Sequence, residues 1–159
     1  MIIGSGDIAT MLNDREGALF FASGVSDSSC VDEREFRRER ELLLEQDPKL
    51  CCFYFSSIVA EIKDSHYFTH KVEMEHMVRM HFYNYNIIRL GNINWGVNPN
   101  TFLNALRWKI QNNQAVEILD EYRYMIDEKE LLLITDNLPL IGKNEINVFG
   151  RMAKVKYLV

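Results

Sequence analysis

Hydrophobic residues along the chain follow two different patterns. Short apolar or aromatic runs, bounded by glycine, serine, asparagine or charged residues, are typical of buried strands and predict them at residues 1–3, 18–22, 50–55, 87–90 and 146–149. Stretches with helix-compatible spacing of apolar residues predict helices at residues 10–14, 31–46, 67–83, 101–111 and 128–135. A further short strand is expected at residues 116–119.

The alternation of strands with helices favours one architecture. Strands that are apolar throughout and separated by helices belong in a parallel sheet with helices on both faces. With 159 residues and 47% hydrophobic content, the chain has room for one well-packed core. We therefore predict a single three-layer, Rossmann-like α/β domain over residues 1–159, with a parallel sheet of about five strands.

Composition and charge exclude several classes of partner. A formal net charge of −5 provides no basic surface for nucleic acid or for an anionic membrane, so neither is an expected partner. Cys30, Cys51 and Cys52 have neither metal-type nor disulfide-type spacing, which favours a reducing compartment. We find neither a signal segment nor the roughly 20 consecutive apolar residues of a membrane span. We expect a soluble, cytoplasmic protein.

Two polar groupings predict no ligand. His66 and His70 have the i to i+4 spacing of one helix face, but no third residue with matching spacing completes a zinc site. No metal is therefore expected. The stretch 32–45 alternates acids and arginines, which is typical of a solvated helix face laced with salt bridges.

The first candidate site is the glycine-rich segment that follows the opening strand. Residues 4–9 read G-x-G-x-x-A and lead into a predicted helix. The missing side chains at such a turn let backbone N–H groups approach a pyrophosphate at the helix N-terminus. A tight strand-to-helix turn without any ligand has the same pattern, so both interpretations stay open.

The second candidate site combines a tyrosine, a lysine and a serine. Tyr67 and Lys71 lie one helical turn apart, so the ammonium can lower the pKa of the phenol and make it a usable acid or base. Ser57, at the end of a predicted strand, could hold a substrate oxygen. Y-x-x-x-K is also common by chance, and a solvated helix face is the competing interpretation.

The second candidate is part of a longer run of residues. The chain contains, in this order, Ser56-Ser57, Tyr67-x-x-x-Lys71, Glu75 and Arg89-x-x-Asn92. This order resembles the S-S … Y-x-x-x-K-x-x-x-E … R-x-x-N run of the extended short-chain dehydrogenase/reductases, the group that holds nucleotide-sugar epimerases and dehydratases. Residues 122–131 are similar to the R-D-[YF]-[IV]-x-x-x-D-[LV] segment of the same group. The resemblance extends, with gaps, from about residue 1 to residue 150.

The resemblance implies a function and a role for each matching residue. It implies an epimerase, dehydratase or reductase that uses NAD or NADP and acts on a nucleotide sugar. Tyr67 would be the catalytic acid/base, Lys71 would tune it and bind the nicotinamide ribose, and Ser57 would orient the substrate oxygen. Asn92 would contact the nucleotide sugar, and Arg123 would bind its diphosphate. The cofactor site would comprise Lys71 together with Gly4, Ser5, Gly6, Asp7, Ile8, Ala9, Ala22, Ser23 and Gly24.

The resemblance also implies a domain organisation and an assembly. Residues 92–159 would contribute a reduced substrate-binding part. Relatives pair through two long helices, which correspond here to residues 31–46 and 67–83, so a homodimer is expected.

The chain departs from the family at several places. Only nine residues separate Ser57 from Tyr67, so Ser56 is a possible substitute, and Tyr124 stands where the family has an aspartate after its arginine. The first turn of the family is G-x-x-G-x-x-G, whereas this chain has G-x-G-x-x-A. Only a few residues separate the turn of this chain from Ala18, so two strands and a helix of the usual unit have no counterpart here. The family also has an acidic residue, about 20 positions past the glycines, that holds the adenosine ribose. This residue has no counterpart in the chain either. Two alternatives therefore stay open. One is a catalytically degenerate binding or scaffold protein, and the other is a nucleotide-sugar binder that needs no dinucleotide.

Overall fold

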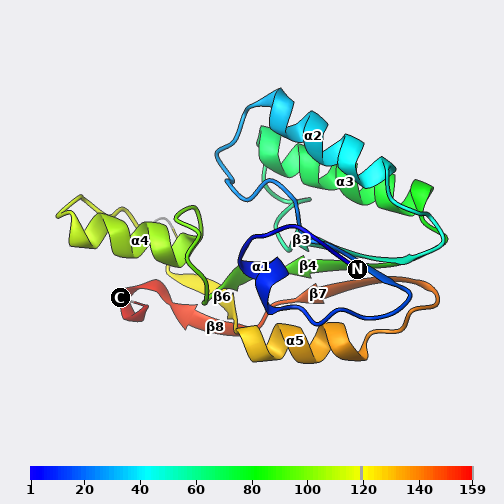
Figure 1. Ribbon diagram of the computed structural model, residues 1–159. Coiled ribbons are helices and arrows are strands. Elements are labelled where there is room, and N and C mark those ends of the chain that lie inside the picture. The colour runs from blue at the N-terminus through cyan, green and yellow to red at the C-terminus, as the bar shows by residue number, and fades with distance from the viewer. Residues whose placement is uncertain (119, 159) are drawn as a thin grey trace.

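The computed structural model describes residues 1–118 and 120–158, which are arranged in three layers (Figure 1). The middle layer is a sheet of five strands in the order β1-β2-β3-β4-β7, and every neighbouring pair is parallel. Its strands are β1 (Ile2–Ile3), β2 (Ala18–Phe21), β3 (Cys51–Ser57), β4 (Asn84–Leu90) and β7 (Lys143–Val148). The predicted three-layer α/β class and the parallel sheet of about five strands are confirmed.

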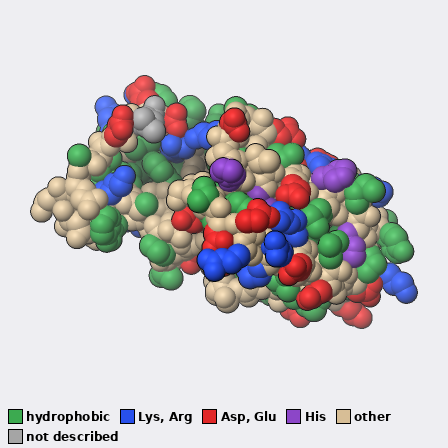
Figure 2. Space-filling view, turned by 90° about the horizontal axis from the view of Figure 1, so that it is seen from above, with side chains coloured by type: hydrophobic (Ala, Val, Ile, Leu, Met, Phe, Trp, Pro, Cys, Tyr) green, Lys and Arg blue, Asp and Glu red, His purple; other side chains and the backbone are tan. Residues whose placement is uncertain are grey.

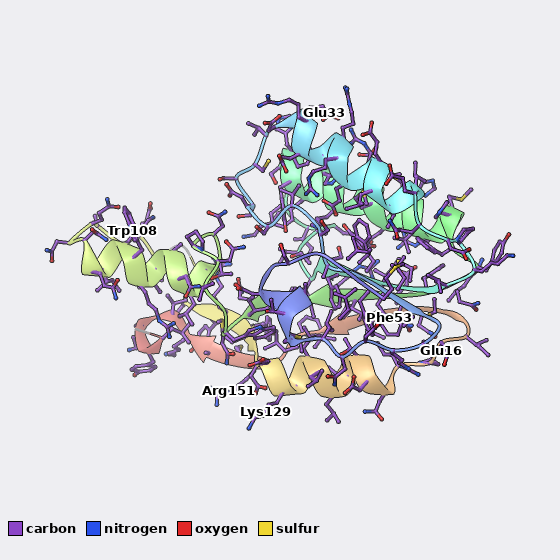
Figure 3. The ribbon with its side chains drawn as sticks, in the orientation of Figure 1. Glu16, Glu33, Phe53, Trp108, Lys129 and Arg151 are labelled. Carbon is purple, nitrogen blue, oxygen red and sulfur yellow. The ribbon has the colours of Figure 1, made fainter. Side chains whose placement is uncertain are left out.

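Helices cover both faces of this sheet. On one face lie α2 (Glu33–Leu44) and α3 (His66–His81), and on the other lie α1 (Asp7–Met11) and α5 (Glu128–Asn137) (Figure 1). Side chains alternate between the faces of a strand, so Leu19 and Phe21 of β2 pack toward α2 and α3 while Phe20 packs toward α5. Phe53, labelled in Figure 3, belongs to the α5 side of the core.

Side-chain caps set the start of three helices, α2, α3 and α5. Asp32 accepts a hydrogen bond from the Arg34 amide, and Ser65 accepts one from the Phe68 amide, so α2 and α3 begin immediately after these residues. Asp127 caps α5 in the same way through the Glu130 amide. The predicted helices at 31–46, 67–83 and 128–135 therefore exist, with ends shifted by one to two residues.

A second, smaller sheet was not predicted. It contains β5 (Asn92–Ile93), β6 (Tyr122–Ile126) and β8 (Arg151–Lys154) in the order β5-β6-β8, and α4 (Phe102–Gln111) packs beside it (Figure 1). A short 3₁₀ turn, Val155–Tyr157, follows β8. These strands are short and partly exposed, and their partners are distant in sequence, so no local apolar run marks them.

The strand predicted at 116–119 was wrong over residues 116–118, which form no regular structure, and Leu119 lies outside the described residues. Residues 92–159 contribute to both sheets, because β7 and α5 belong to the main domain core. Among the described residues, no helix has the length and apolarity needed to cross a membrane.

An ion-pair network fastens α3 to the sheet. Glu75, which is 1% exposed, accepts hydrogen bonds from Arg89 Nε at 2.9 Å and from Arg79 Nη2 at 3.0 Å. Both arginines also reach Glu145 on β7, with Arg79 Nε at 2.7 Å from Oε1 and Arg89 Nη2 at 2.9 Å from Oε2. Glu75 and Arg89, two residues of the family run, are thus partners in one structural contact.

This network predicts how stability depends on pH. Hydrogen bonds from Arg79, with a further contribution from Arg89, lower the pKa of Glu145 from 4.5 to about 2. Because the pKa is lowered in the folded state, the stabilisation is complete above the ordinary pKa and is lost as the pH falls toward about 2. We expect Glu145→Gln to lower the free energy of unfolding at neutral pH by about 1 kcal/mol.

Denaturant titrations across the acidic range check this prediction. The difference between the wild type and Glu145→Gln should shrink as the pH falls, whereas Glu41→Gln, on the exposed side of α2, should follow the wild type throughout. If the difference in unfolding free energy between the wild type and Glu145→Gln stayed constant with pH, the lowered pKa of Glu145 would be contradicted.

Candidate functional site

A cavity of about 1000 Å³ lies where the main strands end, between the sheet and the β5-β6-β8 unit. Many of the residues predicted from the sequence line it: Ser5, Gly6, Ile8, Ala22, Ser23, Gly24, Ser57, Tyr67, Lys71, Asn92 and Arg123. Gly4, Asp7 and Ala9 belong to the predicted cofactor turn but are outside this lining. Ligands of open parallel sheets bind at this edge, because the ends of all the strands converge there.

Lys71 is the buried cation among the basic residues that line the cavity. Its ammonium donates hydrogen bonds to Tyr54 Oη at 3.3 Å and to Glu39 Oε1 at 3.4 Å, and the residue is only 4% exposed. Burial by itself lowers the pKa of Lys71, but the charge and hydrogen bond of Glu39, with further contributions from Tyr67 and Glu75, together outweigh it, so the pKa is raised.

Tyr67 lies beside Lys71, as the i to i+4 spacing predicts. The Lys71 nitrogen is 5.7 Å from the centroid of the Tyr67 ring, while its hydrogen bonds go to other residues. Burial raises the pKa of Tyr67, and the opposing effect of the Lys71 charge is smaller. The expectation that the ammonium leaves this phenol with a lowered pKa is therefore wrong.

Two serines at the end of β3 face the cavity. Ser57 Oγ accepts a long hydrogen bond of 3.4 Å from the Val59 amide. Ser56 Oγ is buried, and among the described residues it has no hydrogen-bond partner. The cavity thus contains a hydroxyl group that the fold itself leaves unpaired, next to the serine that the sequence singled out.

The two glycines of the first turn, Gly4 and Gly6, have different structural roles. Gly4 has φ +130°, and a Cβ there would lie 2.4 Å from the Ala22 carbonyl oxygen, so close packing of two strand ends requires glycine. A Cβ at Gly6 would meet no atom within 4 Å, so this position is open toward the cavity. The Asp7 carboxylate accepts hydrogen bonds from the amides of Val97 at 3.0 Å and Asn98 at 2.9 Å, which secures the 95–98 loop beside the turn.

Asn92 and Arg123 lie on the opposite side of the cavity. The Asn92 amide donates to the Tyr124 carbonyl at 3.2 Å. The Arg123 guanidinium pairs with Asp120 at 2.7 Å and lies 4.8 Å from the centroid of the Phe102 ring. Its Nε is buried and has no hydrogen-bond partner among the described residues. Trp108, in contrast, lies on the outward side of α4 and is 54% exposed (Figure 3).

Sequence reasoning missed Glu39. The acid-and-arginine run at 32–45 was interpreted as a solvated face, but Glu39 is fully buried and binds Lys71. The signal was present in the spacing, because Glu39 lies three residues after Phe36 and four before Leu43, on the buried stripe of α2. Its pKa is lowered to about 2: burial opposes the ionised form, but Lys71 and hydrogen bonds from His70 and the Val25 amide outweigh it.

Comparison with solved structures places this geometry among known folds. WbmG of Bordetella bronchiseptica, solved with NAD and UDP, matches with a TM-score of 0.68 and 13% identity over 88% of this chain. A variant of UDP-glucuronic acid 4-epimerase from Bacillus cereus, solved with NAD and UDP-4-deoxy-4-fluoro-glucuronic acid, matches with 0.67 and 14% over 94%. UDP-glucose 4-epimerase of Thermotoga maritima, solved with UDP-glucose, matches with 0.66 and 14% over 89%.

These matches cover 53%, 59% and 58% of the three solved chains, so this chain spans a little over half their length. No protein-family model matches the sequence, and no curated protein matches it either. At this level of identity the likeness shows the fold. The Rossmann-like fold of nucleotide-sugar epimerases, implied by the sequence resemblance, is confirmed.

The buried pair beneath the cavity predicts a contrast between two glycines. A Cβ at Gly24 would lie 2.7 Å from Lys71 Nζ and 2.9 Å from Glu39 Oε1, so Gly24→Ala must displace a buried ion pair. We expect it to lower the free energy of unfolding by about 1–3 kcal/mol. Gly6 also lines the cavity, but a Cβ there would meet no atom within 4 Å. We therefore expect Gly6→Ala to change the free energy of unfolding by no more than about 0.5 kcal/mol. Urea denaturation of both variants measures the contrast, and equal effects would contradict it.

Proposed function

We propose that the chain is an NAD(P)-dependent epimerase, dehydratase or reductase of the short-chain dehydrogenase/reductase type that acts on a nucleotide sugar. One observation carries the proposal: Ser57, Tyr67, Lys71, Asn92 and Arg123 come from four elements, β3, α3, β5 and β6, and line a single cavity. The cavity lies at the carboxyl edge of a parallel sheet, the usual ligand position in such folds. The solved relatives bind NAD and UDP or UDP-sugars, which gives the ligand classes to test.

In this proposal each side chain does a task suited to its surroundings. Tyr67 transfers a proton to or from a sugar oxygen, and Lys71 stabilises its phenolate by charge. Ser57, or the neighbouring unpaired hydroxyl of Ser56, holds that oxygen by a hydrogen bond. Arg123 and Asn92 bind the diphosphate and nucleotide end, since a guanidinium is suited to phosphate oxygens.

The cavity fits one half of a dinucleotide better than the other. Lys71 can donate to the hydroxyls of a nicotinamide ribose, and Gly6 leaves open space for a pyrophosphate beside the first turn. When bound, the nicotinamide would accept and return a hydride. For the adenosine half, β1 is an edge strand of the described sheet, and the family's acidic residue has no counterpart.

The position of β1 at the edge of the sheet favours a second candidate function. A degenerate Rossmann-like protein could bind a nucleotide or nucleotide sugar, or serve as a scaffold, without turnover. Two observations favour it: the sheet ends at β1, and the Lys71 ammonium is already bonded to Glu39 and Tyr54. A binder would still use Arg123 and Asn92.

Thermal-shift measurements with NAD, NADP, UDP and UDP-glucose separate these functions. A ligand at a hundredfold its Kd stabilises the folded state by about 2.7 kcal/mol, which is readily measured. We expect stabilisation by a dinucleotide and by a UDP-sugar. Stabilisation by UDP-sugars alone would favour the binder, and no response to any dinucleotide would exclude the enzyme.

Turnover of the Tyr67→Phe variant then tests the chemical role. Because the ring is retained, we expect ligand-induced stabilisation to persist while turnover falls by roughly 10²–10⁴-fold. Tyr83→Phe, the same substitution at a tyrosine that is 65% exposed and outside the cavity lining, is the matched control and should retain turnover. Equal turnover in the wild type and Tyr67→Phe would refute Tyr67 as the acid/base.

The homodimer implied by the resemblance is also a proposal. The face formed by α2 and α3 mixes charged and apolar side chains (Figure 2), and Leu44 and Met80 are 51% and 75% exposed on it. We expect Met80→Glu to convert a dimer to a monomer in sedimentation velocity, because it places a charge among these apolar groups. Leu133→Glu, on the opposite face of the domain, should leave the dimer intact. A monomeric wild type would refute this interface.

A further inference from the structure

The Glu39 carboxylate connects elements on both sides of the α2–α3 pair. Oε1 accepts hydrogen bonds from Tyr54 Oη at 3.1 Å and Lys71 Nζ at 3.4 Å. Oε2 accepts from the Val25 amide at 2.9 Å and lies 2.9 Å from His70 Nε2. Glu39 is 0% exposed, so these four groups replace water as the polar partners of its carboxylate.

His70, which contacts Glu39, also lines a second cavity. This cavity, of about 500 Å³, lies where α2 and α3 begin, and His70 lines it together with Phe36, Thr69 and Glu73. His70 is 2% exposed, and its Nδ1 has no hydrogen-bond partner among the described residues. The nearest acidic oxygen, Glu73 Oε2, is 3.8 Å from Nδ1, and Phe36 stacks on the imidazole with 4.4 Å between ring centroids.

The remaining charged groups around His70 stand at the rim of this opening. Glu33 and Arg40 of α2, and Asp64 and His66 at the start of α3, line the same cavity. Arg40 pairs with Glu73 at 3.1 Å and also with Glu33. The rim therefore has three carboxylates and one guanidinium, and the imidazole lies between a buried carboxylate and a net-negative rim.

The hydrogen-bond chemistry fixes which nitrogen carries a proton. An ionised carboxylate can only accept, so His70 Nε2 must be the donor to Glu39. In neutral imidazole the other nitrogen then has a free lone pair, and this nitrogen is the unpaired one at the second cavity. A buried polar atom without a protein partner is the place where water can bind.

We propose that His70 and Glu39 form a proton relay between the second cavity and Lys71. For inward transfer, Nδ1 takes a proton from water and Nε2 gives its proton to Glu39 Oε2. The carboxyl group turns about its Cγ–Cδ bond and passes a proton to a neutral Lys71 amine. The result is one proton gained by Lys71, an ionised Glu39 and a neutral His70 in its other tautomer. In the inward direction the water that gives the proton leaves as hydroxide. Outward transfer is the same sequence reversed, and it starts from the tautomer of His70 that has its proton on Nδ1.

The use of the relay rests on the proposed function, although the connection itself does not. Tyr67 lies beside Lys71, and its phenol must lose a proton before it can act as a base. A substrate and cofactor would fill the main cavity, and the opening at His70 would then be the route by which Lys71 exchanges protons with solvent.

The test is the rate at which the Lys71 ammonium hydrogens exchange with water. NMR on the full chain with nitrogen-15 lysine measures this rate, and loss of the signal in Lys71→Met assigns it. We expect His70→Gln to slow the exchange several-fold, because its amide can still donate to Glu39 but cannot pass a proton on. His66 lines the same cavity, and His66→Gln should leave the exchange rate of the Lys71 hydrogens unchanged.

A second variant covers the case in which His70→Gln does not fold. Thr69 is an exposed residue lining the second cavity, so Thr69→Phe should obstruct the opening, leave the buried network in place and slow the exchange as well. Equal exchange rates in the wild type, His70→Gln and Thr69→Phe would refute the relay. Absence of turnover and of dinucleotide binding in the wild type would refute the proposed function instead, since the exchange measurement needs neither.

Discussion

The buried carboxylate of Glu39 is the interaction on which the cavity depends. A lysine that is 4% exposed cannot keep its charge in a low-dielectric environment without a partner, because removing an ammonium from water is costly. Glu39 is that partner, and it also binds α2 to α3 and to the backbone at Val25. Gly24 follows from the same constraint, since a side chain there would collide with the pair.

The sequence predicted the parts of this structure that follow from local patterns. The apolar runs at 18–22 and 50–55 marked central strands, because strands covered on both faces need no polar alternation. The spacing of Tyr67 and Lys71 placed them side by side, and the polar residues after four strands converged on one edge. These features depend on period and chain order, which a sequence displays directly.

Features that depend on partners distant in sequence were missed. Residues 122–126 form a strand only because 92–93 and 151–154 lie on either side of them. Glu39 was assigned to solvent because its neighbours in sequence are charged, although Phe36 and Leu43 share its helix face. The pKa of Tyr67 was predicted from one charge, whereas burial decides its direction. In each case the three-dimensional environment outweighs the local signal.

The resemblance to short-chain dehydrogenases combines residues with different physical roles. Glu75 and Arg89 bind each other and hold α3 on β4, so their presence reflects the fold and would be expected in a binder as much as in an enzyme. Lys71 also joins layers, since it binds Glu39 of α2 and Tyr54 of β3. The Tyr67 hydroxyl forms no such bond among the described residues, and Ser56 leaves its hydroxyl unpaired at the cavity. The case for chemistry therefore rests on the cavity residues alone.

The same distinction applies to the polar network beneath the cavity. Apolar side chains of similar volume often replace a buried ion pair without loss of stability, so packing α2 against α3 does not require a charged core. Here an ion pair, a phenol and an imidazole are buried together, and one imidazole nitrogen faces a second cavity without a protein partner. An arrangement that costs desolvation and leaves a polar atom unsatisfied is poorly explained as a stabilising core. It is better explained as a means of holding a charge at Lys71 and of exchanging a proton with it.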